Sequence, residues 1–551
     1  MVEPIIEETR VRSECLTKKR IFANGQKLAK KPFTTPNYRK FGQYAPASEI
    51  STRIMDFSSN SIRILFGLKL RQLRLDKALT QYDLADMSGV SVSYINEIEK
   101  GKKYPKTDKI IALASAMGVT YETLVSVQLS KKMEPIYELL RSNILRDLPL
   151  SMFGIEPADL LELLANAPTK LSAFISTIME IGRQYNLSVE EFYFAVLRTY
   201  VEMHENYFAE IEQAADTFLA EVSPDSAIQL TDEFLTQYLR SRHGYTVELF
   251  DNESHPHLNS LRSVLLPAEK KLLINQTLTT DQRAFTLGRE VGFLCLNSKE
   301  RPLTSSWVEV RSFDQVLTNF QASYFSGAIL MRKERLLPLM EHWLNRPTWA
   351  EAAVALEQML DQLQATPETL LHRMSNFLPH YFGIDQLFFL RFEHRPGTAH
   401  FDLTKEMHLA RLHSPHGITG EHYCRRWVSL SILAELADQQ QHGPVERPLL
   451  RAQVSDYIDS RNAYFIFGLA RPLTPIHDLN HSVSLGILLN EASQKQIRFL
   501  NDPAINRRDV NESCERCRAV DCLERSAPPT LLHKRERVQA LKDALQELGV
   551  R

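Results

Sequence analysis

Residues 80–101 have the sequence TQYDLADMSGVSVSYINEIEKG, and this stretch decides the fold of the N-terminal part of the chain. Thr80 is a favourable N-cap for a first short helix, which Gly89 ends. Ser91 caps a second short helix, and Gly101 stops it. The pattern predicts two helices joined by a tight turn, the arrangement in which a helix-turn-helix presents a recognition helix to the major groove of DNA.

The flanking sequence extends this pair into a compact helical unit over residues 60–127. An amphipathic helix from Ile64 to Leu75 precedes the pair, with Arg74 on its polar face. Two further helices follow, one that begins at Thr107 and one over Tyr121–Val125. The expected shared core consists of Leu84, Ala85, Val90, Ile95 and Ile98.

Length and composition limit the class of protein. At roughly 150 residues per domain, a chain of 551 residues holds several domains. Hydrophobic residues make up 44% of it, but no uninterrupted apolar run approaches the ~18 residues of a membrane span. The N-terminus lacks a secretory pattern, so we expect a cytoplasmic protein. The net charge of −2 means that affinity for DNA must come from a local basic patch.

A basic segment opens the chain. Residues 10–40 contain ten Lys or Arg residues and one acidic residue, Glu14. We expect residues 1–55 to form a disordered basic arm. Such an arm can grasp DNA phosphates. The alternatives are a solvated extension and upstream sequence that precedes a start at Met55.

Residues 129–225 are expected to form a helical linker or dimerisation region. Within it, Val189–Glu221 has the pattern of one long helix whose apolar stripe is either core or a dimer seam. The dipeptide His204-Glu205 does not begin a zinc motif, because Phe208 stands where a second histidine is needed. The stripe consists of Phe192, Val196, Tyr200, Met203, Tyr207 and Ile211.

Residues 226–345 have a mixed α+β pattern. Strands are expected over Tyr245–Phe250 and Lys271–Asn275, where branched and aromatic residues gather. A helix is expected to follow from Thr280, and another over Phe320–Met331. This segment is predicted to be a separate α+β domain.

Residues 346–551 alternate apolar runs with helical pieces such as Arg426–Gln441. The alternation favours an antiparallel sheet with flanking helices, which commonly encloses a small-molecule pocket. The expected fold class is therefore multidomain: an all-α helix-turn-helix domain, a helical linker, an α+β domain and an α+β sensor-like C-terminal domain. The apolar runs are Leu387–Phe392, Tyr464–Ala470, Ser482–Leu489 and Ile497–Leu500.

Three of the six cysteines crowd into nine residues, as Cys514-x-x-Cys517-x4-Cys522. So few cysteines in so long a chain do not form a disulfide framework. Two thiolates at the first spacing can chelate one ion, and Cys424 is our candidate for a fourth ligand. Four thiolates suit structural zinc or an iron–sulfur cluster. The alternative is that the thiols are free and serve packing.

The helical unit closely resembles the Xre and phage-repressor helix-turn-helix. The resemblance rests on Thr80-Gln81, Leu84-Ala85, Gly89-Val90-Ser91, Tyr94-Ile95, Ile98-Glu99 and Gly101, in that order. It implies that Val92, Ser93 and Glu97 face base edges, while Gln81 and Asn96 lie near phosphates. Val92 can contact a thymine methyl, Ser93 can bond a base edge or a phosphate, and Glu97 can accept from cytosine. Three lysines at the end of the recognition helix are placed to hold phosphates: Lys100, Lys102 and Lys103.

Residues 226–345 look like an ImmA/IrrE metallopeptidase domain. The resemblance lies in Leu273-Ile274-Asn275, in residues 282–287 and in residues 322–331. Active members carry His-Glu-x-x-His, in which two histidines hold zinc and the glutamate acts as base. This chain has Arg289-Glu290-Val291-Gly292-Phe293 there, and Asn319-Phe320-Gln321 where the family supplies an acidic third ligand. We therefore expect a degenerate peptidase fold without zinc ligands, and no enzyme activity.

Together, these parts from Met55 to about Ala527 are similar to the architecture of the short-chain fatty-acyl transcriptional regulators. The resemblance implies control of acyl-CoA metabolism and an acyl-CoA effector. Cys424-Arg425-Arg426-Trp427 departs from the family's usual Cys-Pro-Leu-Trp, and the basic arm is extra. We expect a homodimer that binds double-stranded operator DNA and responds to a metabolite. The alternatives are a regulatory peptidase that acts on a partner repressor and a redox or metal sensor that uses the C-terminal cysteines.

Overall fold

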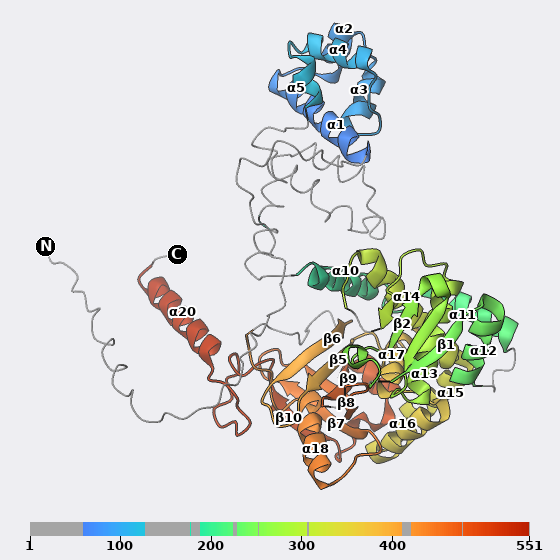
Figure 1. Ribbon diagram of the computed structural model, residues 1–551. Helices are drawn as coiled ribbons and strands as arrows, with labels where there is room; N and C mark the ends of the chain where they lie inside the picture. The colour runs from blue at the N-terminus through green and yellow to red at the C-terminus, as the bar shows by residue number, and fades with distance from the viewer. Residues whose placement is uncertain are drawn as a thin grey trace, which may run out of the picture. The chain divides into compact units, whose positions relative to one another are not determined.

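The computed structural model describes residues 59–126, 177, 188–223, 229–251, 253–305, 308–409, 420–476 and 478–549 (Figure 1). The predicted basic arm over residues 1–55 lies outside these ranges, as does most of the predicted linker before residue 188. No helix in the described ranges is long and apolar enough to cross a membrane.

The first described unit is a helical domain built as the sequence predicts. Its helices are α1 (Ser59–Asp76), α2 (Gln81–Ser88), α3 (Val92–Glu99), α4 (Thr107–Ala116) and α5 (Tyr121–Val125). Thr80 caps α2 through a capping box with Asp83, and Ser91 caps α3. Gly89 ends α2 in the left-handed conformation at φ 63°, which glycine adopts without strain. The predicted core is confirmed: Leu84, Val90, Ile95 and Ile98 are buried, and Ala85 packs against them.

Helices α1 and α3 meet at a glycine. A Cβ atom on Gly67 would lie 2.2 Å from the carbonyl oxygen of Ile98, so no larger residue fits between the two helices. The sequence predicts Arg74 on the polar face of α1, and this prediction is wrong. Arg74 is buried, because its side chain reaches Glu99 of α3. The recognition helix is thus fixed to α1 by a close backbone approach and by a buried ion pair.

The predicted peptidase-like segment contains a small mixed sheet with helices. The strands are β1 (Thr246–Phe250), β2 (Ser263–Leu266), β3 (Lys271–Asn275) and β4 (Thr304–Ser305). The helices are α12 (Asp232–His243), α13 (Thr280–Cys295) and α14 (Phe313–Leu330), with 3-10 turns at Pro256–Leu258 and Pro267–Glu269. The strand order is β1-β3-β2-β4, with β1 parallel to β3 and the other pairs antiparallel. The two predicted strands and the two predicted helices of this segment are therefore confirmed.

A larger sheet forms the C-terminal part. Its strands are β5 (Leu387–His394), β6 (Phe401–His408), β7 (Leu449–Tyr457), β8 (Ala463–Pro472), β9 (Asn480–Leu488) and β10 (Asn506–Val510). They run in the order β10-β7-β8-β9-β5-β6, antiparallel except that β10 pairs with β7 in parallel. The run Ile497–Leu500 is expected from the sequence to be a strand, but it leads into a 3-10 helix (Arg498–Asn501). The reason is that the Phe499 ring packs among Trp343, Trp349 and Phe465.

Helices cover both faces of this sheet. They are α15 (Lys333–Leu344), α16 (Trp349–Leu363), α17 (Pro367–Phe382) and α18 (Val428–His442), followed along the chain by α19 (Glu491–Gln496) and α20 (Thr530–Glu547). Alternate residues of β5 point to opposite faces: Phe389 packs in a cluster with α15–α17, and Phe388 in a cluster with α18. The first cluster also contains Leu287 of α13, so one core joins both sheets. The predicted boundary at residue 345 falls between α15 and α16, which share that core.

The predicted single helix over Val189–Glu221 is two helices, α10 (Val189–Met203) and α11 (Ala209–Val222). The prediction is wrong because Glu205 and Asn206 adopt left-handed conformations, at φ 50° and 56°. The Asn206 amide donates to Ser375 Oγ at 2.9 Å, and its backbone oxygen accepts from Asn376 at 2.8 Å. Asparagine tolerates this conformation, and these contacts with α17 hold the break.

Candidate functional site

The recognition helix α3 has one buried side and one available side. Ile95, Ile98 and Glu99 are buried, whereas Ser93 is exposed and Val92 is partly exposed. Asn96 and Glu97 are also partly exposed. Of the residues that the resemblance assigns to base edges and phosphates, the four in α3 therefore lie on the side that faces away from the domain core, and Gln81 begins α2.

Two of these residues are held by contacts within the domain. The Gln81 amide donates to Glu99 Oε2 at 2.7 Å, so it supports the buried ion pair from the start of α2. Glu97 pairs with Lys103 at 2.9 Å in an exposed bridge. The hydrogen bond and the charge of Glu97 raise the pKa of Lys103. Because exposed bridges contribute little, Glu97 can leave Lys103 for a base at small cost.

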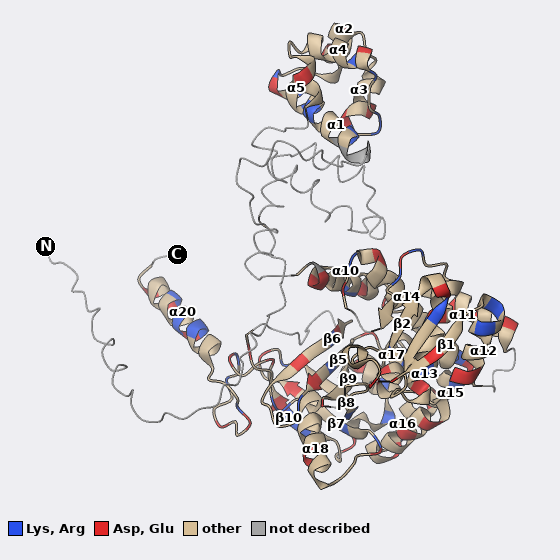
Figure 2. Cartoon of the chain, viewed as in Figure 1, with Lys and Arg blue, Asp and Glu red and all other residues tan. Residues whose placement is uncertain are grey.

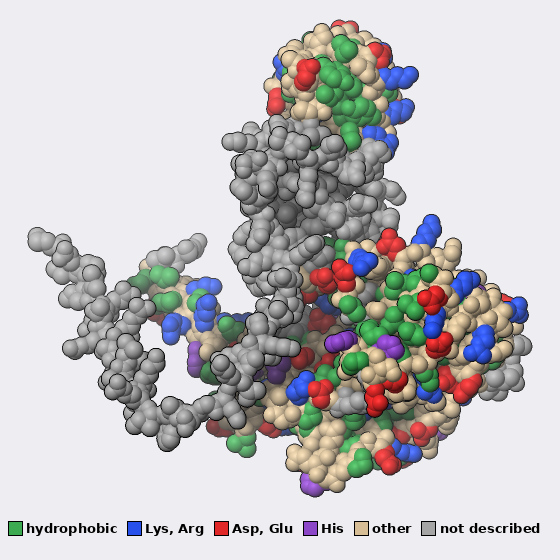
Figure 3. Space-filling view, in the orientation of Figure 1, with side chains coloured by type: hydrophobic (Ala, Val, Ile, Leu, Met, Phe, Trp, Pro, Cys, Tyr) green, Lys and Arg blue, Asp and Glu red, His purple; other side chains and the backbone are tan. Residues whose placement is uncertain are grey.

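The lysines form a basic loop after α3. Lys102 and Lys103 are exposed and Lys100 is partly exposed. Figure 2 shows lysines of this loop in blue, and in Figure 3 the blue Lys and Arg side chains gather along one edge of the domain. Flexible cations beside an exposed recognition helix are suited to phosphate contacts, which position the helix without reading sequence.

The degenerate peptidase position contains an arginine network. Arg289 Nη1 donates to Ser305 Oγ at 2.6 Å, and its Nη2 donates to Asn319. Glu290 accepts both bonds from Arg301, at 2.6 and 2.9 Å. The Arg301 guanidinium lies 4.7 Å above the Phe293 ring. Burial, reinforced by the nearby charge of Arg262, lowers the pKa of Arg289 to about 10. Arg289 thus stands at the first zinc-ligand position of the resemblance, and the Arg301 guanidinium lies over Phe293 at the second. The charges of both guanidinium groups oppose a metal cation.

The cysteines lie on two segments that pair with each other. The backbone N–H of Cys424 donates to Glu512 O at 3.2 Å, and that of Cys514 donates to His422 O at 2.9 Å. Burial raises the pKa of Cys424, and the thiols of Cys514 and Cys517 act on it in the same direction. The Cys522 thiol donates to Glu524 Oε2 at 3.8 Å.

These four thiols do not converge on one point. Across the described ranges, no three Cys, His, Asp or Glu side chains form a group that could hold a metal ion. Backbone amides already serve as partners: Ser526 N–H lies 3.4 Å from Cys514 Sγ, and Ala519 N–H lies 3.5 Å from Cys517 Sγ. The arrangement as it stands does not fit a four-ligand centre, so the predicted metal site stays a prediction.

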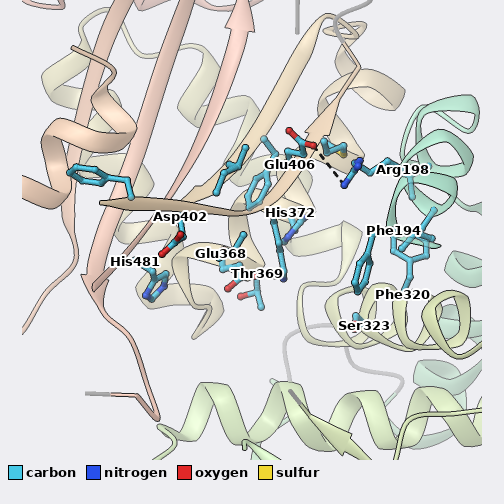
Figure 4. A pocket seen from close by; sticks show the side chains of 18 of the residues that line it. Phe194, Arg198, Phe320, Ser323, Glu368, Thr369, His372, Asp402, Glu406 and His481 are labelled. Atoms are coloured by element: carbon cyan, nitrogen blue, oxygen red, sulfur yellow. Dashed lines mark hydrogen bonds and ion pairs between the residues drawn. The ribbon is translucent and has the colours of Figure 1, made fainter. Parts of the chain in front are cut away.

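A cavity of about 1260 Å³ lies between the peptidase-like helices and the larger sheet (Figure 4). Its walls come from α10, α13, α14, α17, β5, β6 and the loop over residues 420–425. Aromatic side chains, including Phe194 and Phe320, line one side. Arg198 of α10 forms an ion pair with Glu406 of β6 at 3.7 Å, which links these two walls of the cavity. The cavity exceeds the usual volume of small-molecule pockets, roughly 300–1,000 Å³.

The sequence predicts a pocket within residues 346–551, but many of the residues that line this cavity belong to the earlier helices α10, α13 and α14. Phe194, Arg262 and Phe320 were not identified as site residues, because each lies on a different element and no local pattern links them. His372 was also missed. Burial, with the charge of Lys405, lowers the pKa of His372 to about 3, so it is neutral and stacks on Phe389 at 4.1 Å.

Comparison with known proteins agrees with the two motif domains. The family described as Helix-turn-helix matches residues 70–124, and the family described as IrrE N-terminal-like domain matches residues 241–375. The Control protein C.BamHI of Bacillus amyloliquefaciens is 38% identical over 68 residues, which are 12% of this chain and 84% of that protein.

Longer matches extend beyond the DNA-binding domain. The Propionyl-CoA carboxylase regulator of Cereibacter sphaeroides is 23% identical over 57% of this chain and 65% of its own length. The HTH-type transcriptional regulator RamB of Mycobacterium tuberculosis is 21% identical over 56% of this chain and 64% of its own length. The chain thus spans just under two thirds of these curated relatives. It belongs to the Xre-type helix-turn-helix proteins that also carry an IrrE N-terminal-like domain.

Proposed function

We propose that this protein is a transcriptional regulator that binds a two-fold DNA operator as a homodimer and responds to a metabolite in its cavity. The observation that carries the proposal is the presence, in one chain, of an exposed recognition helix and a large cavity lined by aromatic and charged side chains. A short-chain acyl-CoA is the proposed effector. The name of the Cereibacter relative, which refers to propionyl-CoA carboxylase, supports this class of ligand.

Regulation requires that the effector bind the DNA-competent and DNA-incompetent states with different affinities. The cavity is suited to such a role because it is shared by elements far apart in sequence, so a ligand that fills it contacts α10, α14 and α17 together. A change in packing among these helices is the proposed output of ligand binding.

We also propose that the IrrE-like domain has no peptidase activity. A zinc peptidase needs ligands that hold the ion and activate a water. In this chain Arg289 is engaged with Ser305 and Asn319, and Glu290 is engaged with Arg301. These contacts therefore disfavour the alternative function, a regulatory peptidase.

The test of the effector is operator binding in the presence of acyl-CoAs. With a DNA site selected from random sequence, a short-chain acyl-CoA is expected to change the Kd of the full-length protein by about 5- to 150-fold, the usual range of allosteric coupling. Acetyl-, propionyl-, butyryl- and palmitoyl-CoA should be compared by fluorescence anisotropy. An unchanged Kd with every thioester would contradict the proposed effector class.

A chelated sample and an oxidised sample complete that experiment. If the cysteines hold a metal that the regulator needs, chelation should remove stoichiometric zinc or iron and alter operator affinity. If the protein is a redox sensor, Cys517→Ser should abolish the response of operator binding to oxidant. Neither the wild type nor the variant should then respond to acyl-CoA. No metal and no oxidant response would leave the cysteines as packing residues.

The recognition helix can be tested with two matched substitutions. Ser93→Ala removes a side chain proposed to read a base, so it should weaken the selected site by ~1–3 kcal/mol and leave random DNA unaffected. Lys102→Ala removes a phosphate contact, so it should weaken all sequences alike and reduce the slope of log K against log salt by about one. Equal losses on selected and random DNA for Ser93→Ala would exclude a base-reading role.

A further inference from the structure

One end of the cavity carries charged side chains from several elements. Arg262 lies just before β2, Glu368 in α17, Lys405 in β6, Arg471 in β8 and His481 in β9. Their charges act on one another. Figure 4 places His481 and Glu368 on the side of the cavity away from Phe194 and Phe320. The cavity therefore has a charged end and an aromatic end.

Two carboxylates at the charged end, Glu368 and Glu393, are already paired with cations. Glu368 accepts from Lys405, and its other oxygen lies 3.4 Å from Arg391 Nε. Glu393 accepts from Arg391 Nη1 at 2.5 Å. Burial alone would raise the pKa of Glu368, but the charges of Lys405 and Arg391 hold it well below its usual range. Two cations and two carboxylates thus compensate one another.

Arg262 and Arg471 have no such partner. Within the part of the chain that the structure describes, neither guanidinium forms an ion pair, and Nε of Arg471 is enclosed without a hydrogen-bond partner. Asp281 and Glu368 act on Arg471 only at longer range. Burial lowers the pKa of both arginines, because enclosure penalises a charge that nothing adjacent neutralises.

His481 adds hydrogen-bonding capacity to this end without adding charge. Its side chain lines the cavity, is only 3% exposed, and its Nδ1 has no hydrogen-bond partner. Burial, with the charges of Arg391 and Arg471, holds the pKa of His481 well below its usual range. It is therefore neutral at pH 7, and one ring nitrogen can donate while the other accepts.

We infer that the charged end binds an anionic group of the ligand, a phosphate or a carboxylate, through Arg262, Arg471 and His481. The inference rests on the proposed role of the cavity as a metabolite site. Guanidinium groups match the planar or forked oxygens of these anions, and an enclosed site strengthens the pairing. A cationic group finds Glu368 and Glu393 already neutralised, and Asp402, which Figure 4 labels on the same side as His481, lies 2.8 Å from His400. The aromatic end then receives the apolar part of the same molecule.

The test compares pantetheine thioesters that differ in the anion they carry. Propionyl-phosphopantetheine carries a phosphate, propionyl-pantetheine carries no charge, and succinyl-pantetheine carries one carboxylate. By isothermal titration calorimetry, the full-length protein should bind a charged thioester roughly ten- to a hundredfold more tightly than propionyl-pantetheine. Tight binding of propionyl-phosphopantetheine alone identifies a phosphate as the anion, and tight binding of succinyl-pantetheine identifies a carboxylate.

The variants Arg262→Gln and Arg471→Gln should lose this preference, whereas Arg311→Gln should keep it, because Arg311 is a surface arginine with a 74% exposed side chain. Thermal melting separates a binding defect from misfolding: replacing an uncompensated buried cation should not lower the Tm. The inference is overturned if wild type binds neutral and charged thioesters equally, or if both arginine variants keep the preference.

Inorganic phosphate and citrate distinguish this inference from the proposed function. If no thioester binds but these anions raise the Tm of the wild type and not of Arg471→Gln, the acyl-CoA proposal fails and the anion site stands. If thioesters bind regardless of charge and of both arginines, the acyl-CoA proposal stands and the anion site fails.

Discussion

Replacing Glu99 with alanine is expected to unfold the helix-turn-helix domain. The Glu99 side chain is 0% exposed and accepts from Arg74 at 2.6 and 2.9 Å and from Gln81 at 2.7 Å. Removing it leaves the buried Arg74 guanidinium with only the carbonyl oxygen of Leu79. Breaking one side of a buried ion pair costs roughly 3–5 kcal/mol. A domain of this size has a total stability of about 3–10 kcal/mol, so most or all of it is lost.

The chain provides a matched control two residues away. Glu97→Ala breaks the exposed bridge to Lys103, whose side chains are 38% and 55% exposed, and should change stability by about 1 kcal/mol or less. All four tryptophans lie between residues 307 and 427, so tryptophan fluorescence reports on the C-terminal part alone. Glu99→Ala should therefore abolish operator binding and reduce helical circular dichroism without moving the fluorescence transition. Retention of wild-type operator affinity by Glu99→Ala would contradict the assigned role of the pair.

The helix limits of this domain could be predicted from the sequence and its buried ion pair could not, for a physical reason. The helix limits at Thr80, Gly89 and Ser91 are local features, because a cap or a left-handed glycine acts within one turn of its own position. The Arg74–Glu99 pair spans 25 residues, and the amphipathic pattern of α1 gives no sign that this arginine turns inward. Local order was predictable, and the long-range ion pair was not.

The break between α10 and α11 shows the same limit. No glycine or proline interrupts Val189–Glu221, and the apolar spacing continues through it. The break depends on Asn206 bonding to Ser375 and Asn376, about 170 positions later in the chain. The cavity has the same origin, because Phe194 and Phe320 become neighbours only through that packing.

Replacing Glu212 with glutamine is expected to destabilise the C-terminal part to a similar extent. Glu212 of α11 binds Arg373 of α17, with the second bond at 2.9 Å, and accepts from the Tyr324 hydroxyl of α14 at 2.7 Å. The two charged side chains are 8% and 2% exposed. Glu212→Gln removes the charge and leaves Arg373 uncompensated, so we expect a loss of roughly 3–5 kcal/mol. Urea unfolding followed by tryptophan fluorescence measures it.

The ion pair also predicts how this stability depends on pH. Burial alone would raise the pKa of Glu212, but the hydrogen bond and charge of Arg373 outweigh burial, and the pKa is lowered. A carboxyl group with a lowered folded-state pKa stabilises the fold above its unfolded pKa of about 4.3. That contribution is lost as the pH falls through the folded-state pKa. The urea midpoint of the wild type should therefore decrease more steeply below about pH 4 than that of Glu212→Gln.

Two further variants decide whether the charge pair is responsible. Asp216→Asn, one turn along α11, breaks an exposed bridge to Lys333 whose side chains are 45% and 34% exposed, and should cost about 1 kcal/mol or less. Replacing both buried charges, as Glu212→Gln with Arg373→Met, should recover part of the loss, because no charge is then left unpaired in the interior. If the double variant is no more stable than Glu212→Gln, the loss comes from packing around α11 and α17 and not from an uncompensated charge.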